Sequence, residues 1–165
     1  MANDEGDRQA RSGLTHVRAD GTAHMVDVSA KAVTARSATA RGRVLLAAPA
    51  VAALRYGTVP KGDALAVARI AGIQAVKRTP DLIPLAHPIA VHGVELDLEV
   101  VDDGVDLTAT VRTADRTGIE MEALTAVAVG ALALIDMVKA VDKHARITDV
   151  RVTAKSGGRS GDWSE

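Results

Sequence analysis

The spacing of apolar and polar residues changes along the chain and marks its elements in turn. In the segment 61–77, KGDALAVARIAGIQAVK, apolar residues recur at helical spacing, and Pro80 ends the pattern. In the segment 91–101 apolar residues alternate with acidic ones, which indicates a strand with one face toward water. An Asp-Asp-Gly turn at 102–104 leads into a second strand-like segment at 105–113. Together these segments predict a helix followed by an antiparallel β-hairpin.

The remaining segments complete the expected order of elements. Strands are predicted at 24–29, 33–46 and 145–154, although Ala and Arg weaken the pattern in the second of these. A short helix opens at Pro49 and is closed by Gly57. Two long helices, separated by a hairpin and flanked by strands, give the α+β fold class. We predict a ferredoxin-like βαββαβ sandwich, with an antiparallel sheet and the helices packed on one face.

The second long helix is the most apolar part of the chain. Within the segment 118–141 only Thr125 and Gly130 interrupt the apolar residues between Glu122 and Asp136. This stretch is too short to cross a bilayer, which needs about 20 residues, so it predicts a buried helix. A helix that is apolar on all sides must be covered by a sheet and by another surface. We therefore expect an oligomer and no membrane association.

Composition narrows the possible functions. The chain has 165 residues and no Phe, its only aromatic residues are Tyr56 and Trp163, and its formal net charge is −1. These values argue against an aromatic base-stacking platform and against a generally basic, nucleic-acid-binding surface. Cysteine is absent, which excludes disulfides, thiolate nucleophiles and cysteine-bound metals.

The ends of the chain differ from its body. Residues 1–13 are polar and charged and predict a flexible N-terminal tail, and residues 156–165, SGGRSGDWSE, predict a Gly/Ser-rich C-terminal tail. We expect a single catalytic domain at 14–155. The N-terminal residues include no apolar leader segment, which favours a cytoplasmic protein.

Two segments between the predicted elements carry candidate chemistry. Lys61 lies at the start of a predicted helix, where it could hold a phosphate or donate a proton; alternatively, Asp63 is a helix cap and Lys61 is simply solvated, which the spacing alone favours. Pro84 and Pro88 flank His87, a constraint that suits a positioned acid, base or ligand, although a structural histidine has the same appearance. The histidines show no metal-ligand spacing, so we expect no metal site.

Charged residues lie at both ends of the long apolar helix. Glu120 and Glu122 are placed where the helix dipole favours acids, but an alternating pair around Met121 exceeds what the dipole requires. Asp136 and Lys139 share a face and predict a partly buried ion pair.

The length of this helix bears on the site. Fourteen residues separate Glu122 from Asp136, which places them about 21 Å apart along the axis. If both ends are catalytic, we expect the site to be shared between two subunits whose helices run antiparallel.

Six phrases of the chain stand out when taken together. They are LTH with GxAHMVDVSAK at 14–31, KGD with ARIAGIQAxKRT at 61–79, DLIPLxHP at 81–88, TGxEMEALTA at 117–126, DMxKAV at 136–141 and AKSGGxSGD at 154–162. In this order, over roughly residues 14 to 162, they resemble a known family, the cyclic pyranopterin monophosphate synthases or MoaC proteins of molybdenum cofactor biosynthesis.

The resemblance implies a lyase without redox chemistry or a required organic cofactor. Its substrate would be 3′,8-cyclised dihydroguanosine triphosphate, and its products cyclic pyranopterin monophosphate and diphosphate. By motif, Asp136, Lys139 and Lys61 match the catalytic residues. Substrate binding falls to Leu85, Ala86, His87, Glu120, Met121, Glu122 and Lys155, with Lys31 and Asp27 as further candidates for the same pocket.

The resemblance also implies a homohexamer, a trimer of dimers with the active site at the dimer interface. Ala86 departs from the family pattern, since many members have Cys there; the residue remains small, so the loop should keep its shape. A non-catalytic nucleotide- or pterin-binding module of the same fold is the alternative, which the presence of Lys61, Asp136 and Lys139 disfavours.

Overall fold

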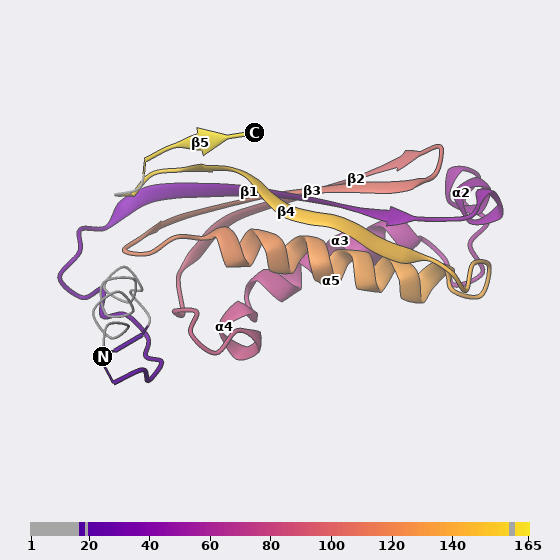
Figure 1. Ribbon diagram of the computed structural model, residues 1–165. Coiled ribbons are helices and arrows are strands. Elements are labelled where there is room, and N and C mark those ends of the chain that lie inside the picture. The colour runs from indigo at the N-terminus through magenta and orange to yellow at the C-terminus, as the bar shows by residue number, and fades with distance from the viewer. Residues whose placement is uncertain (1–16, 19, 159–160) are drawn as a thin grey trace, which may run out of the picture.

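A five-stranded antiparallel sheet with helices on one face forms the body of the protein (Figure 1). The computed structural model describes residues 17–18, 20–158 and 161–165. The N-terminal tail expected at 1–13 lies outside these residues. In chain order the elements are β1 Thr34–Leu45, α2 Ala48–Arg55, α3 Ala64–Val76, α4 Thr79–Leu82, β2 Val91–Val101, β3 Gly104–Asp115, α5 Glu120–Val138, β4 Arg146–Ser156 and β5 Trp163–Ser164.

The strands lie in the order β2-β3-β1-β4-β5. Strand β1 is central and pairs with β3 over its whole length, from Thr34 opposite Asp115 to Leu45 opposite Gly104, and with β4 on its other edge. The main elements follow one another as strand, helix, hairpin, helix and strand. The predicted α+β, ferredoxin-like sandwich is confirmed.

The core between sheet and helices is built from small aliphatic side chains, because the chain has no Phe. Ala40 of β1, Leu107 of β3 and Val127 of α5 are all fully buried there. The helices α3 and α5 come close because Gly72 has no side chain: a Cβ at this position would lie 2.7 Å from the carbonyl oxygen of Ala126. The core is thus filled by bringing the backbones of neighbouring elements close together instead of by large side chains.

Helix α5 has 19 residues and a mean hydropathy of 1.8, long and apolar enough by these two measures to cross a membrane. In the structure it packs against the sheet and α3, which accounts for its composition without a bilayer. Its outer face keeps Leu132 58% exposed, and the neighbouring helix α3 exposes Val67 and Ile70. The covering of α5 by a partner subunit, expected from its sequence, stays a prediction.

The structure departs from the sequence predictions in three places. The strand predicted at 24–29 is wrong: Val26 and Val28 line a cavity there, and Asp27 accepts a hydrogen bond from the backbone N–H of Ser29 at 2.8 Å, which turns the chain. The four-residue helix α4 was not predicted. In the segment expected to be a C-terminal tail, two residues form strand β5, which pairs with β4.

Candidate active site

The two ends of α5 carry two separate groups of candidate residues. Helices α3 and α5 lie side by side (Figure 1). At the C-terminal end of α5, Lys61 reaches Asp136 from the turn before α3. Its Nζ donates to the Asp136 carboxylate and to the Asp136 backbone carbonyl, both at 2.8 Å. Lys139 Nζ lies 2.6 Å from the other carboxylate oxygen. One carboxylate therefore holds two ammonium groups.

The sequence left two interpretations of the turn before α3: a functional Lys61, or a helix cap at Asp63 with Lys61 solvated. The structure agrees with part of each. Asp63 caps the helix by accepting a hydrogen bond from the backbone N–H of Ala66 at 2.9 Å. Lys61, however, is not simply solvated, because it is tied to Asp136. The glycine between them, Gly62, has φ +99°, a value that favours glycine and lets the chain turn from the lysine into the helix.

The charge state of this cluster is set by the lysines. Hydrogen bonds from Lys139 and then Lys61 lower the pKa of Asp136 to about 2, so the carboxylate is ionised at neutral pH. The three side chains are 41% to 58% exposed, more than the partly buried pair that the sequence predicted. In a single chain the cluster is open to water, and only a covering surface would give it the dry surroundings that strengthen electrostatic catalysis.

The N-terminal end of α5 borders a cavity of about 500 Å³. The structure brings to it the loop residues Leu85, Ala86 and His87 together with Glu120, Met121 and Glu122 of the helix. His87 Nε2 lies 2.7 Å from the carbonyl oxygen of Val26 and so carries a proton toward it, which leaves Nδ1 for another partner. Val26 belongs to the segment that was predicted as a strand.

Among the ionisable groups of this cavity, Glu122 has the pKa that differs most from its ordinary value in water. It is 3% exposed, and burial, aided by the charge of Glu120, raises its pKa to about 7. A carboxyl group with this pKa can accept or donate a proton near neutrality.

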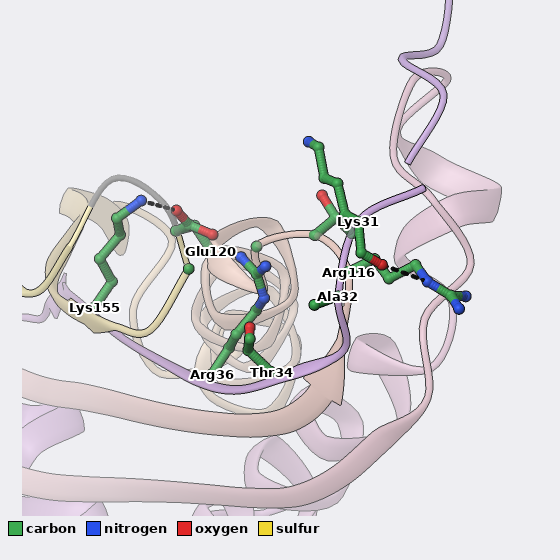
Figure 2. Close-up of a pocket in the computed structure, with 10 residues that line it drawn as sticks. Lys31, Ala32, Thr34, Arg36, Arg116, Glu120 and Lys155 are labelled. Atoms are coloured by element: carbon green, nitrogen blue, oxygen red, sulfur yellow. Dashed lines mark hydrogen bonds and ion pairs between the residues drawn. The ribbon is translucent and has the colours of Figure 1, made fainter. Parts of the chain in front are cut away.

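A second, basic cavity of about 640 Å³ adjoins the first, and Lys31, Thr117, Gly118 and Glu120 line both. Lys155 Nζ lies 2.9 Å from Glu120 Oε1. Burial alone would raise the pKa of Glu120, but the hydrogen bond and charge of Lys155 reverse this and lower it. Figure 2 shows Arg36 pointing toward Glu120.

Arg36 and Arg116 line the basic cavity, and the sequence analysis did not single them out. Arg116 turns away from Glu120 and donates from Nε to the carbonyl oxygen of Lys31 at 2.9 Å (Figure 2). Of the two further candidates, Lys31 lines both cavities, and Asp27 lines neither. With Lys155, four basic residues line this cavity, a chemistry that suits phosphate groups.

Among the residues that the structure describes, no three histidine or carboxylate side chains gather in a way that could hold a metal ion. The ionisable side chains at the two ends of α5 include lysine, arginine, carboxylate and histidine groups.

Comparison with known proteins decides the family. A model of the MoaC family matches residues 25–158. The chain belongs to the MoaC family. A relative from Streptomyces coelicolor named cyclic pyranopterin monophosphate synthase is 65% identical, with 96% of each chain covered. A relative from Nocardioides of the same name is 64% identical, covering 92% of this chain and 94% of its own. Cyclic pyranopterin monophosphate synthase 2 of Mycobacterium tuberculosis is 54% identical over 99% of both chains.

The MoaC phrases fall at the two ends of α5 in the structure. The phrases that contain Lys61, Asp136 and Lys139 meet at its C-terminal end. Those that contain His87, Glu122 and Lys155 surround its N-terminal end. Within one chain the two groups are separated by the length of the helix.

Proposed function

We propose that this chain synthesises cyclic pyranopterin monophosphate, a step of molybdenum cofactor biosynthesis, as its relatives are named to do. It is a lyase of the MoaC family. Its substrate is the 3′,8-cyclised dihydroguanosine triphosphate, and diphosphate is released. The observation that carries the proposal is the cluster of Lys61, Asp136 and Lys139, in which one ionised carboxylate holds two proton donors.

The basic cavity receives the phosphates in this proposal. Forming a cyclic phosphate while diphosphate leaves builds negative charge on the phosphate oxygens, which cations at fixed positions stabilise. Lys155 and Arg36 from the strands, with Lys31 from the preceding loop, surround a cavity large enough for these groups. Glu120 keeps Lys155 in place through its ion pair at 2.9 Å.

The cavity beside His87 receives the ring system. Leu85 and Met121 supply apolar contact, and both are exposed to the cavity in the single chain. Rearrangement of a purine-derived ring into a pyranopterin requires proton transfers, and we assign these to Glu122 and His87, which both line this cavity. Glu122 is suited to this by its pKa of about 7.

Lys61 and Lys139 are the proton donors of the other half-site, at the C-terminal end of α5. Asp136 stays ionised down to a pH of about 2 and thus keeps both ammonium groups oriented over the whole neutral range. It also offsets part of their positive charge when water is excluded. We assign Asp136 an orienting and proton-accepting role.

The two half-sites combine across a dimer. Met121, Leu132 and Lys139 are spaced to lie on one face of α5, and residue 129 is halfway between Glu122 and Asp136. An antiparallel α5 crossing near residue 129 would bring Asp136 of the partner subunit opposite Glu122. The exposed apolar face of α3 and α5 supports this pairing. We extend it to a hexamer, a trimer of such dimers, located in the cytoplasm.

The experiment is a turnover assay on the purified protein with the cyclised dihydro-GTP. We expect cyclic pyranopterin monophosphate and diphosphate from the wild type, and a rate lower by about 100-fold or more in Lys139→Ala and Asp136→Asn, since each removes a group used in proton transfer. Asp97→Asn is the matched control, because Asp97 is exposed on the other face of the sheet. A folded wild-type oligomer that binds the substrate but makes no product would overturn the proposal and leave a binding module.

A further inference from the structure

Two consecutive glycines follow β4, and the second of them, Gly158, lines the basic cavity. Gly157 and Gly158 have φ values of +82° and +81°, in the left-handed region that favours glycine. A Cβ at Gly157 would collide with the carbonyl oxygen of Ala35, and one at Gly158 with the guanidinium group of Arg36. The backbone of this turn therefore lies directly against β1 where Arg36 enters the cavity.

A carboxylate further along the chain holds this turn. Asp162 Oδ1 accepts a hydrogen bond from the backbone N–H of Gly157 at 2.7 Å. The next residue, Trp163, pairs with Lys155 in the β4–β5 ladder, and the chain end is hydrogen-bonded further along β4. Asp162 thus belongs to a stretch of chain that is fixed to the strand carrying Lys155.

Arg36 is held from two sides. Its Nε donates to the carbonyl oxygen of Asp115 at 3.0 Å, and Gly158 packs against the end of its guanidinium group. The same side chain points toward Glu120, the partner of Lys155 (Figure 2). If the glycine turn moved away, the guanidinium group would gain freedom on the side of the cavity.

We propose that Asp162 is a positioning residue of the basic cavity: it holds the glycine turn against Arg36 and so sets the spacing between Arg36 and Lys155. It acts through the turn and does not itself touch the substrate. The proposal rests on the proposed function, because it takes the basic cavity as the place of the phosphates. Its effect is on binding, since well-spaced cations lower the cost of ordering them around phosphate.

The test compares Asp162→Ala with Asp162→Asn, whose amide oxygen can accept the same hydrogen bond. For Asp162→Ala we expect KM for the cyclised substrate and Kd for inorganic diphosphate to rise about tenfold, with kcat changed less than about threefold. For Asp162→Asn we expect both constants to stay near wild type. Asp102→Ala removes the same charge at the β2–β3 turn and should change neither constant.

A second variant keeps the proposal testable if Asp162→Ala does not fold. Gly158→Ala keeps Asp162 but pushes on Arg36, and it should raise the same two constants. Equal values of KM and Kd in wild type and Asp162→Ala would overturn the proposal, as would an Asn variant as weak as the Ala variant. If the wild type makes no product, the proposed function fails, while calorimetric titration with diphosphate still decides whether Asp162 positions the cavity.

Discussion

At the scale of single residues, the ionisation of Glu122 makes the stability of the fold depend on pH. Its pKa is about 7 in the folded protein, against 4.5 ordinarily, so folding favours its protonated form. Its contribution to stability is fully present below a pH of about 4.5 and is lost as the pH rises through about 7. We expect Glu122→Gln to be roughly 3 kcal/mol more stable than wild type near a pH of about 8, and no more than about 1 kcal/mol different near a pH of about 4.

Urea unfolding of both proteins at the two pH values measures this difference. Glu99→Gln, an exposed glutamate on β2, is the control and should show no such dependence. A stability difference between Glu122→Gln and wild type that does not change with pH would contradict the pKa and the burial that causes it.

The residues of the site were predictable to different degrees from the sequence. Lys61, His87 and Lys155 stand in phrases with recognisable chemistry or resemblance. Arg36 and Arg116 do not, because Arg36 is one of several arginines in a strand with a weak pattern and Arg116 follows the end of another strand. Their place in the cavity results from the pairing of β1 with β3, which no local pattern reveals.

At the scale of elements, the long periodic segments were predictable and the short ones were not. The hairpin of β2 and β3 and the helix α5 follow from alternation and from a continuous apolar stretch. The segment 24–29 alternates over only a few residues, and its valines pack toward a cavity instead of a sheet partner. Strand β5 has two residues, too few for any period, and forms through its pairing with β4.

The contact of α3 with α5 gives a prediction at this scale. Ala at Gly72 would bring a Cβ 2.7 Å from the carbonyl oxygen of Ala126, whereas Ala at Gly130 would meet its nearest neighbour at 3.3 Å. Overpacking outweighs the gain in helix propensity only at the first position, so we expect Gly72→Ala to lower the free energy of unfolding by about 2 kcal/mol and Gly130→Ala to change it by less than about 1 kcal/mol. Chemical denaturation measures both, and equal losses in the two variants would contradict the close crossing.

At the scale of the whole molecule, the exposed apolar face predicts the assembly. Leu132 is 58% exposed near the middle of α5, so a charge there should leave the monomer fold intact but oppose a helix-to-helix dimer. We expect Leu132→Asp to lower the oligomeric state in sedimentation experiments and to reduce turnover about 100-fold or more, because the half-sites separate. Tyr56→Asp, 81% exposed on the turn after α2, is the control. A Leu132→Asp variant that keeps both its assembly and its turnover would exclude this face as the interface.

We propose that one active site combines Lys61, Asp136 and Lys139, at the C-terminal end of one α5, with the two cavities at the N-terminal end of the partner subunit's α5. The most direct measurement mixes two inactive variants, Lys139→Ala and Lys155→Ala, after subunit exchange. A shared site predicts recovery of about a quarter of wild-type turnover, because half of the dimers are mixed and each mixed dimer restores one of its two sites. No recovery, although exchange is demonstrated and wild type is active, would mean that each subunit uses its own residues and would contradict the account.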